Sequence, residues 1–208
     1  MNTTPADSVP LLASQLERMR GMQYHYHHKF FMCLGVSSLI FLLLWLGGGK
    51  AGSLWIPFLV ITAGVQASFY LHFCDFARTH AVHLERLLNR HYSQRLLMGG
   101  EIEDLYFYPL GEPKLSGLLP LRPLRFFSMF TLHWCVLWMA VSVAAWLHGS
   151  TILNGTERVL YVTGWLIWGG GNALFLIWYF AAKPDLRAID EHLMERLGRT
   201  EGADEVPV

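Results

Sequence analysis

Charged residues are scarce in this chain. Lysine and arginine number 16, as do aspartate and glutamate, so charged residues make up 15% of the 208 positions and the formal net charge is zero. An ordinary soluble domain carries roughly 25% charged residues. The chain therefore has too little polar surface to cover a water-soluble globule of its size. Zero net charge also argues against a nucleic-acid partner.

Cysteine is scarce too, and the short motifs of common catalytic sites are missing. The three cysteines, Cys33, Cys74 and Cys135, include no CxxC pair, and an odd count does not suit a disulfide framework. The sequence contains no Walker A loop, Gly-x-Ser-x-Gly elbow, HExxH or EF-hand pattern. We therefore predict a non-enzymatic protein whose thiols pack as small apolar groups.

Long apolar runs, by contrast, are abundant. Apolar residues make up 53% of the chain. Four runs lack any charged residue: Phe30–Leu46, Leu54–Cys74, Phe126–Leu147 and Val159–Ala182. A helix needs roughly 20 apolar residues to cross the hydrocarbon core of a bilayer. We predict an all-α membrane protein with four transmembrane helices, arranged as two hairpins.

Lysine and arginine are distributed unevenly around these runs. Only Lys50 and Arg158 lie in the two short connections between paired runs. The positive-inside rule then places both termini and the central segment in the cytoplasm, as in a bacterial inner-membrane protein. The predicted segments are a cytoplasmic or interfacial N-terminal helix (1–29), a first hairpin (30–76), a cytoplasmic helix with an irregular segment (77–125), a second hairpin (126–182) and a cytoplasmic C-terminal helix and tail (183–208).

Amphipathic helices are predicted on the cytoplasmic side. Leu84, Leu87 and Leu88 fall near one helix face in the central segment, and Leu186 and Leu193 share a face near the C-terminus. Such helices either lie on lipid headgroups or pack into a cytoplasmic bundle that joins subunits. The apolar stripe suits both arrangements.

Two His-x-Cys pairs begin at His72 and His133, at matching depth near the cytoplasmic ends of their runs. Residues two apart on a helix point about 200° away from each other, so neither pair chelates one ion. His72 and His133 together suit a haem or a transition metal held between two helices. Incidental packing of both histidines is the alternative.

A small and polar stripe follows the second run. Ser68, His72 and Asp75 lie near one helix face, and Asp75 is three residues from both His72 and Arg78. Polar groups at membrane depth should face protein or water rather than lipid. The stripe predicts either a packed, hydrogen-bonded interior or a path for protons or ions.

The segment before the first run carries His25, His27 and His28 beside Tyr24 and Tyr26. Aromatic rings are typical of the boundary between lipid and water. We predict that these residues form an interfacial belt, and a surface site for a transition metal is the alternative.

Glycines cluster in the fourth run, where Gly169, Gly170, Gly171 and Asn172 lie near the expected bilayer midplane. Each glycine costs roughly 1 kcal/mol against alanine in a helix interior. One explanation is close packing of a neighbouring helix, with Asn172 hydrogen-bonded across the contact. The other is an unwound helix that exposes its backbone to a solute.

The layout from Gln23 to Leu97 combines a Tyr/His-rich segment, a tight pair of spans and an Arg-rich amphipathic helix. It resembles the two-span effector modules of bacterial defence systems. The resemblance favours a homo-oligomeric membrane module, pore-forming or scaffolding, that couples to a cytoplasmic partner through its amphipathic helices. The alternatives are a haem- or metal-binding bundle for redox or ion handling and a small-solute transporter with a broken fourth helix.

Overall fold

A computed structural model describes the chain except for residues 1–4, 107–113, 116–118, 121–125 and 183–208. Helices dominate the described part, and β1 and β2 form a short antiparallel pair with Lys114 opposite Pro120. The elements in chain order are α1 (Pro5–Gly47), α2 (Gly49–His91), α3 (Gly99–Tyr106), β1 (Lys114–Leu115), β2 (Leu119–Pro120), α4 (Phe126–Gly149), the 3-10 turn η1 (Ser150–Ile152) and α5 (Gly155–Ala182). The predicted C-terminal helix and tail lie outside the described residues.

Four helices, α1, α2, α4 and α5, are long and apolar enough to cross a membrane. Each contains one of the four apolar runs of the sequence. This confirms the prediction of a helical chain with four candidate membrane spans, as expected of a multi-pass integral membrane protein.

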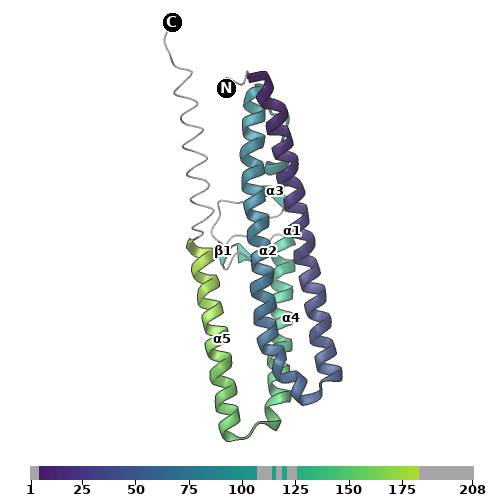
Figure 1. Cartoon of the computed structure of the whole chain (residues 1–208), viewed down its shortest axis with the longest axis vertical. Helices are drawn as coiled ribbons and strands as arrows, with labels where there is room; N and C mark the ends of the chain where they lie inside the picture. Colours follow the sequence, from purple (N-terminus) through teal and green to yellow (C-terminus); the bar gives the residue numbers. More distant parts are fainter. Residues whose placement is uncertain (1–4, 107–113, 116–118, 121–125, 183–208) are drawn as a thin grey trace.

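α1 and α2 continue far beyond their apolar runs. Each has 43 residues, which corresponds to about 65 Å of helix, whereas the hydrocarbon core is about 30 Å thick. Residues 5–29 and 77–91 extend these helices without a break, rather than forming helices of their own as predicted. We call these two extensions the stalk, and Figure 1 shows it reaching past the ends of α4 and α5.

α1 and α2 pack side by side along one seam. From α1, Phe30, Leu34 and Phe41 are buried in the core. The seam residues buried on α2 recur every three or four positions: Ile56, Val60, Ala63, Ala67, Leu71, Cys74, Ala77, Ala81, Leu84 and Leu88. This is the heptad spacing of paired helices, and the alanines among these residues let the two backbones approach closely.

Glycines close the turn between α1 and α2. Gly49 has a φ of +56°, in the left-handed region that glycine adopts without steric cost. A Cβ atom on Gly52 would stand 2.7 Å from the carbonyl oxygen of Leu44. The backbones therefore meet too closely here for any side chain at position 52.

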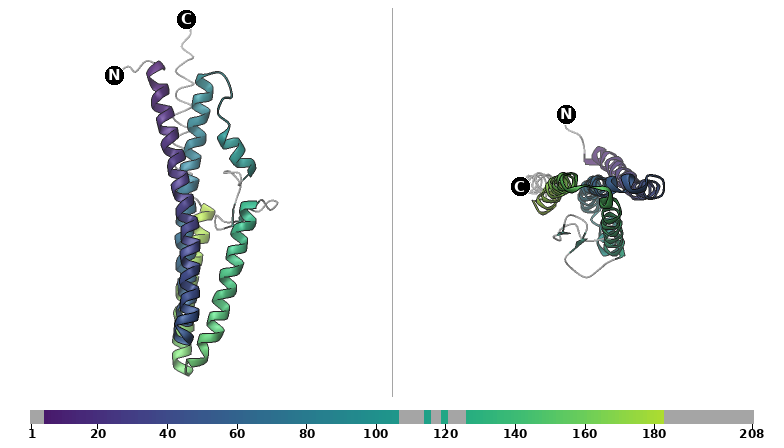
Figure 2. Two further views of the ribbon diagram at one scale, coloured as in Figure 1. Left: turned by 90° about the vertical axis from the view of Figure 1, so that its right-hand side faces the viewer. Right: turned by 90° about the horizontal axis from the view of Figure 1, so that it is seen from below.

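α4 and α5 each pack on α2 rather than on each other, and seen end-on they leave the α1/α2 pair in different directions (Figure 2). Trp138 of α4 is buried, and its Nε1 donates to Ser38 Oγ at 3.0 Å. The hydroxyl of Tyr161 in α5 donates to the Leu54 carbonyl at 2.8 Å. The predicted second hairpin is therefore two consecutive helices that both pack on α2, and α4 also contacts α1 through Trp138 and Ser38.

Substitution of Gly52 by alanine should lower stability, because the added Cβ meets a backbone oxygen that cannot rotate away. We expect a loss of about 1–3 kcal/mol, which is typical of overpacking, measured as thermal unfolding in detergent. Gly35→Ala is the matched control, since its Cβ would meet nothing within 4 Å. It should leave stability unchanged or raise it by up to about 1 kcal/mol, and equal effects of the two changes would contradict the packing of this turn.

Candidate functional site

A group of polar and charged side chains joins α1, α2 and α3 within the stalk. It consists of Arg20 and Gln23 from α1, Arg78 and Glu85 from α2, and Glu103 from α3. These side chains are largely withdrawn from water, with exposed fractions from 4% for Arg78 to 26% for Arg20. We call this set the ionic cluster.

Glu103 is the central acceptor of the ionic cluster. Its Oε1 accepts from Arg20 Nη1 at 2.6 Å and from Gln23 Nε2 at 3.1 Å, and its Oε2 accepts from Arg78 Nε at 3.1 Å. The other guanidinium nitrogen of Arg20 is paired with Glu85. Each carboxylate thus faces at least one guanidinium, which offsets the cost of removing these charges from water.

The first turn of α3 is built against the ionic cluster. Glu85 Oε2 accepts the Gly100 N–H at 2.8 Å, so a carboxylate binds one of the unpaired amides at a helix N-terminus. A Cβ atom on Gly100 would lie 2.5 Å from a methyl carbon of Val82. This stretch was predicted as irregular, but the paired glycines at 99 and 100 allow a helix to sit directly on α2.

Asn89 fixes the connection between α2 and α3. Its Oδ1 accepts the backbone N–H groups of Leu96 and Leu97 at 3.0 and 2.8 Å, and its Nδ2 donates to the Leu97 carbonyl at 2.7 Å. One side chain thereby replaces the backbone partners that this turn lacks. This turn reverses the chain, so that α3 lies against the stalk.

Sequence reasoning did not single out Arg20, Glu85, Glu103 or Asn89 as site residues. A signal was present, because Arg78 and Glu85 are seven residues apart and interrupt an otherwise apolar seam on α2. Charges at seam positions are expensive to bury unless they are paired. Their partners on α1 and α3 were not evident, since nothing in the sequence gives the register between the three helices.

The predicted polar stripe on α2 is partly buried. Ser68 and Asp75 are 2% and 4% exposed, and His72 is half-buried with its ring edge-on to Phe73. The Ser68 hydroxyl donates to the Gly64 carbonyl of its own helix at 2.9 Å. Asp75 lies within electrostatic reach of His27 on α1. This bond of Ser68 stays within α2, and the packed interior and the conducting path both stay predictions.

The other predicted histidines point in several directions. His133 is exposed on α4, with its ring near that of Trp134, while His25 and His28 are exposed and His27 is half-buried on α1. Among the residues that the structure describes, no group of three or more His, Cys, Asp or Glu is placed to hold a metal ion. A haem or metal between His72 and His133, and the interfacial belt, stay predictions.

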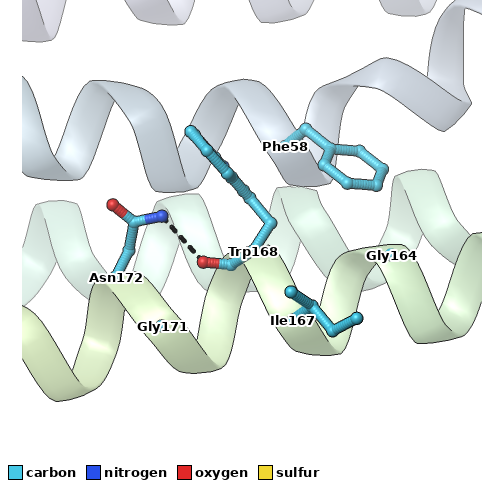
Figure 3. Close-up of a pocket in the computed structure, with 6 residues that line it drawn as sticks. All are labelled: Phe58, Gly164, Ile167, Trp168, Gly171 and Asn172. Atoms are coloured by element: carbon cyan, nitrogen blue, oxygen red, sulfur yellow. Dashed lines mark hydrogen bonds between the residues drawn. The ribbon is translucent and has the colours of Figure 1, made fainter.

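α5 runs as one helix through Gly169–Asn172, so the helix is not unwound at its glycines. Asn172 Nδ2 donates to the Trp168 carbonyl of the same helix at 2.7 Å (Figure 3). The expected bond from Asn172 to a neighbouring helix is thus replaced by a bond along α5. An open groove of about 480 Å³ lies along this part of α5, and it is lined by Phe58 of α2 and by Gly164, Ile167, Trp168, Gly171 and Asn172 of α5 (Figure 3).

The chain matches no family model, no curated protein and no solved structure. The similarity in layout to two-span effector modules therefore stays a prediction from the sequence.

Substitution of Arg20 by methionine should destabilise the stalk, because it removes the shared partner of Glu85 and Glu103 while keeping an unbranched side chain. We expect a loss of about 1–3 kcal/mol, as for a partly buried group left without its partner. Thermal unfolding in detergent measures this loss.

Arg95→Met is the control for Arg20→Met. Arg95 and Glu101 form a pair at 3.6 Å whose side chains are 80% and 61% exposed, and such surface pairs contribute at most about 1 kcal/mol. If Arg95→Met proved as harmful as Arg20→Met, the ionic cluster would have no special part in the stability of the stalk.

Proposed function

We propose that this chain is a non-enzymatic membrane module that self-associates through α5 and presents its stalk in the cytoplasm as a scaffold. The observation that carries the proposal is a regular stripe along α5 that is left exposed, on a helix in whose apolar window no residue is fully buried within the chain. In this proposal the stalk couples association of the membrane helices to the cytoplasmic side of the protein.

The exposed stripe on α5 alternates large and small residues. Leu160, Ile167 and Leu174 are 69%, 72% and 71% exposed, and the exposed Gly164 and Gly171 lie between them at spacings of four and three residues. This is the heptad spacing of a left-handed helix pair. In lipid, helices associate where small residues let backbones approach, so the glycines favour a second helix rather than acyl chains.

The stalk is suited to coupling because it is continuous with the membrane spans. α1 and α2 pass from their apolar runs into the charged region as single helices, and a helix transmits displacement along its axis better than a jointed connection. The ionic cluster then ties α3 to both. The distribution of basic residues around the runs favours a cytoplasmic location for the stalk.

A scaffold fits the interior of the chain better than a pore within one copy. The space between α1 and α2 is filled by apolar side chains such as Phe30, Ile56 and Leu71. The buried hydroxyls of Ser53 and Ser68 bond to carbonyls of their own helix. The packing between α1 and α2 therefore favours a scaffold over a water-filled path between these two helices.

The experiment that tests self-association is the mass of the protein in lipid nanodiscs or mild detergent, measured by native mass spectrometry. We expect a defined oligomer that Gly171→Leu and Gly164→Leu shift toward monomer, because a leucine on the stripe keeps the helices apart. Both positions are open within the chain at the Cβ atom, which would meet nothing within 4 Å.

Gly170→Leu is the matched control. Gly170 also has open space around its Cβ position, but it lies about 100° around the helix from Gly171. The control should keep the mass of the original protein. A monomeric protein, or equal effects of leucine at positions 170 and 171, would exclude the stripe as the contact between copies.

A further inference from the structure

We propose that the ionic cluster is a releasable latch, which holds α3 on the stalk and lets it leave when its charges are outcompeted. This inference rests on the proposed function, since it assigns regulation to the same stalk. α3 follows α2 and precedes α4 in the chain, so its release alters how the stalk is connected to the second pair of membrane helices.

α3 is attached to the stalk mainly through polar groups. Glu103 bonds to side chains of both α1 and α2, and the Gly100 N–H donates to Glu85. Within residues 99–103, where the structure describes the burial of the α3 side chains, Ile102 is the large apolar residue, and it is 60% exposed. Elements with few buried apolar contacts open at lower free energy than the core does, so α3 depends on its charges to stay in place.

The seam between α1 and α2 depends less on the ionic cluster. In the stalk the Arg20–Glu85 pair also links the two helices, but α2 adds apolar side chains to this contact, with Ala81, Leu84 and Leu88 all buried. Salt screens ion pairs that water can reach, and the 26% exposure of Arg20 gives water and ions access to the ionic cluster. Competing ions should therefore open the latch and leave the two long helices together.

The connection before α3 can act as the hinge of this latch. Asn89 holds Leu96 and Leu97 on the end of α2 through three hydrogen bonds that do not involve the ionic cluster. The chain thus stays anchored at Leu97 when Glu103 is released. Gly99 and Gly100 then give the backbone freedom to rotate immediately after the anchor.

The test is a pair of distances measured by pulsed electron resonance in lipid nanodiscs. Spin labels at Tyr24 and Ile102 report on the latch, and labels at Leu11 and Tyr92 report on the stalk; all four side chains are at least half exposed. We expect Glu103→Gln to raise the fraction of open latch about tenfold or more, because it removes the charge-assisted bonds to both arginines. High salt should act in the same direction, and the stalk distance should stay unchanged.

Two further variants make the result decisive. Glu101→Gln neutralises an exposed carboxylate of the same helix and should leave both distances as they are. Gly100→Ala changes no charge but brings a Cβ against Val82, so it should displace α3 and show that the labels detect release.

The proposal is overturned if Glu103→Gln leaves the latch distance unchanged, whatever Gly100→Ala does. It is also overturned if the latch and stalk distances change together, since the ionic cluster would then be part of one structural core. The oligomeric mass of the same samples is an independent readout. A monomeric protein with a working latch would contradict the proposed self-association and leave the latch standing.

Discussion

The seam between α1 and α2 is the constraint on which the rest of the structure depends. Lipid offers no hydrogen bonds to a backbone, and a helix satisfies its backbone groups internally. Two long helices pack side by side where one face of each carries a matching repeat. α2 provides that face from Ile56 to Leu88. α3, α4 and α5 all contact α2, whereas β1 and β2 contact α5 and α4. α2 is therefore the shared support of the other helices.

The seam changes its chemistry along its length. In the apolar runs it is built from alanine, valine and leucine, whereas in the stalk the same face also carries Arg78 and Glu85. The stalk can bury these charges because each has a partner on another helix: Arg20 of α1 pairs with Glu85, and Glu103 of α3 pairs with Arg78. These paired charges fix α3 on the two long helices, and in the proposed latch they also make its position sensitive to competing ions.

The membrane-spanning segments followed directly from the sequence, because an uncharged run of sufficient length has few other stable solutions. The continuity of α1 and α2 did not, since the change from apolar to charged residues near Lys29 and Arg78 looks like a boundary when only composition is considered. The backbone hydrogen bonds of a helix form whether its side chains are apolar or charged, so α1 and α2 continue through this boundary. The ionic cluster was also missed, because Arg20, Glu85 and Glu103 lie far apart in sequence and only the register of the three helices brings them together.

An accessibility scan along α2 tests the unbroken α1/α2 pair most directly. Single spin labels from position 54 to 91, in a chain lacking its three native cysteines, would be probed with oxygen, which partitions into lipid, and with a water-soluble relaxation agent. The structure predicts one uninterrupted helical period, with Val60, Ala67, Ala81 and Leu88 protected throughout and the exposed side changing from oxygen to the water-soluble agent after Asp75. A break in that period, or oxygen access along one face of residues 77–91, would mean that this part of α2 lies on the membrane instead of forming a stalk.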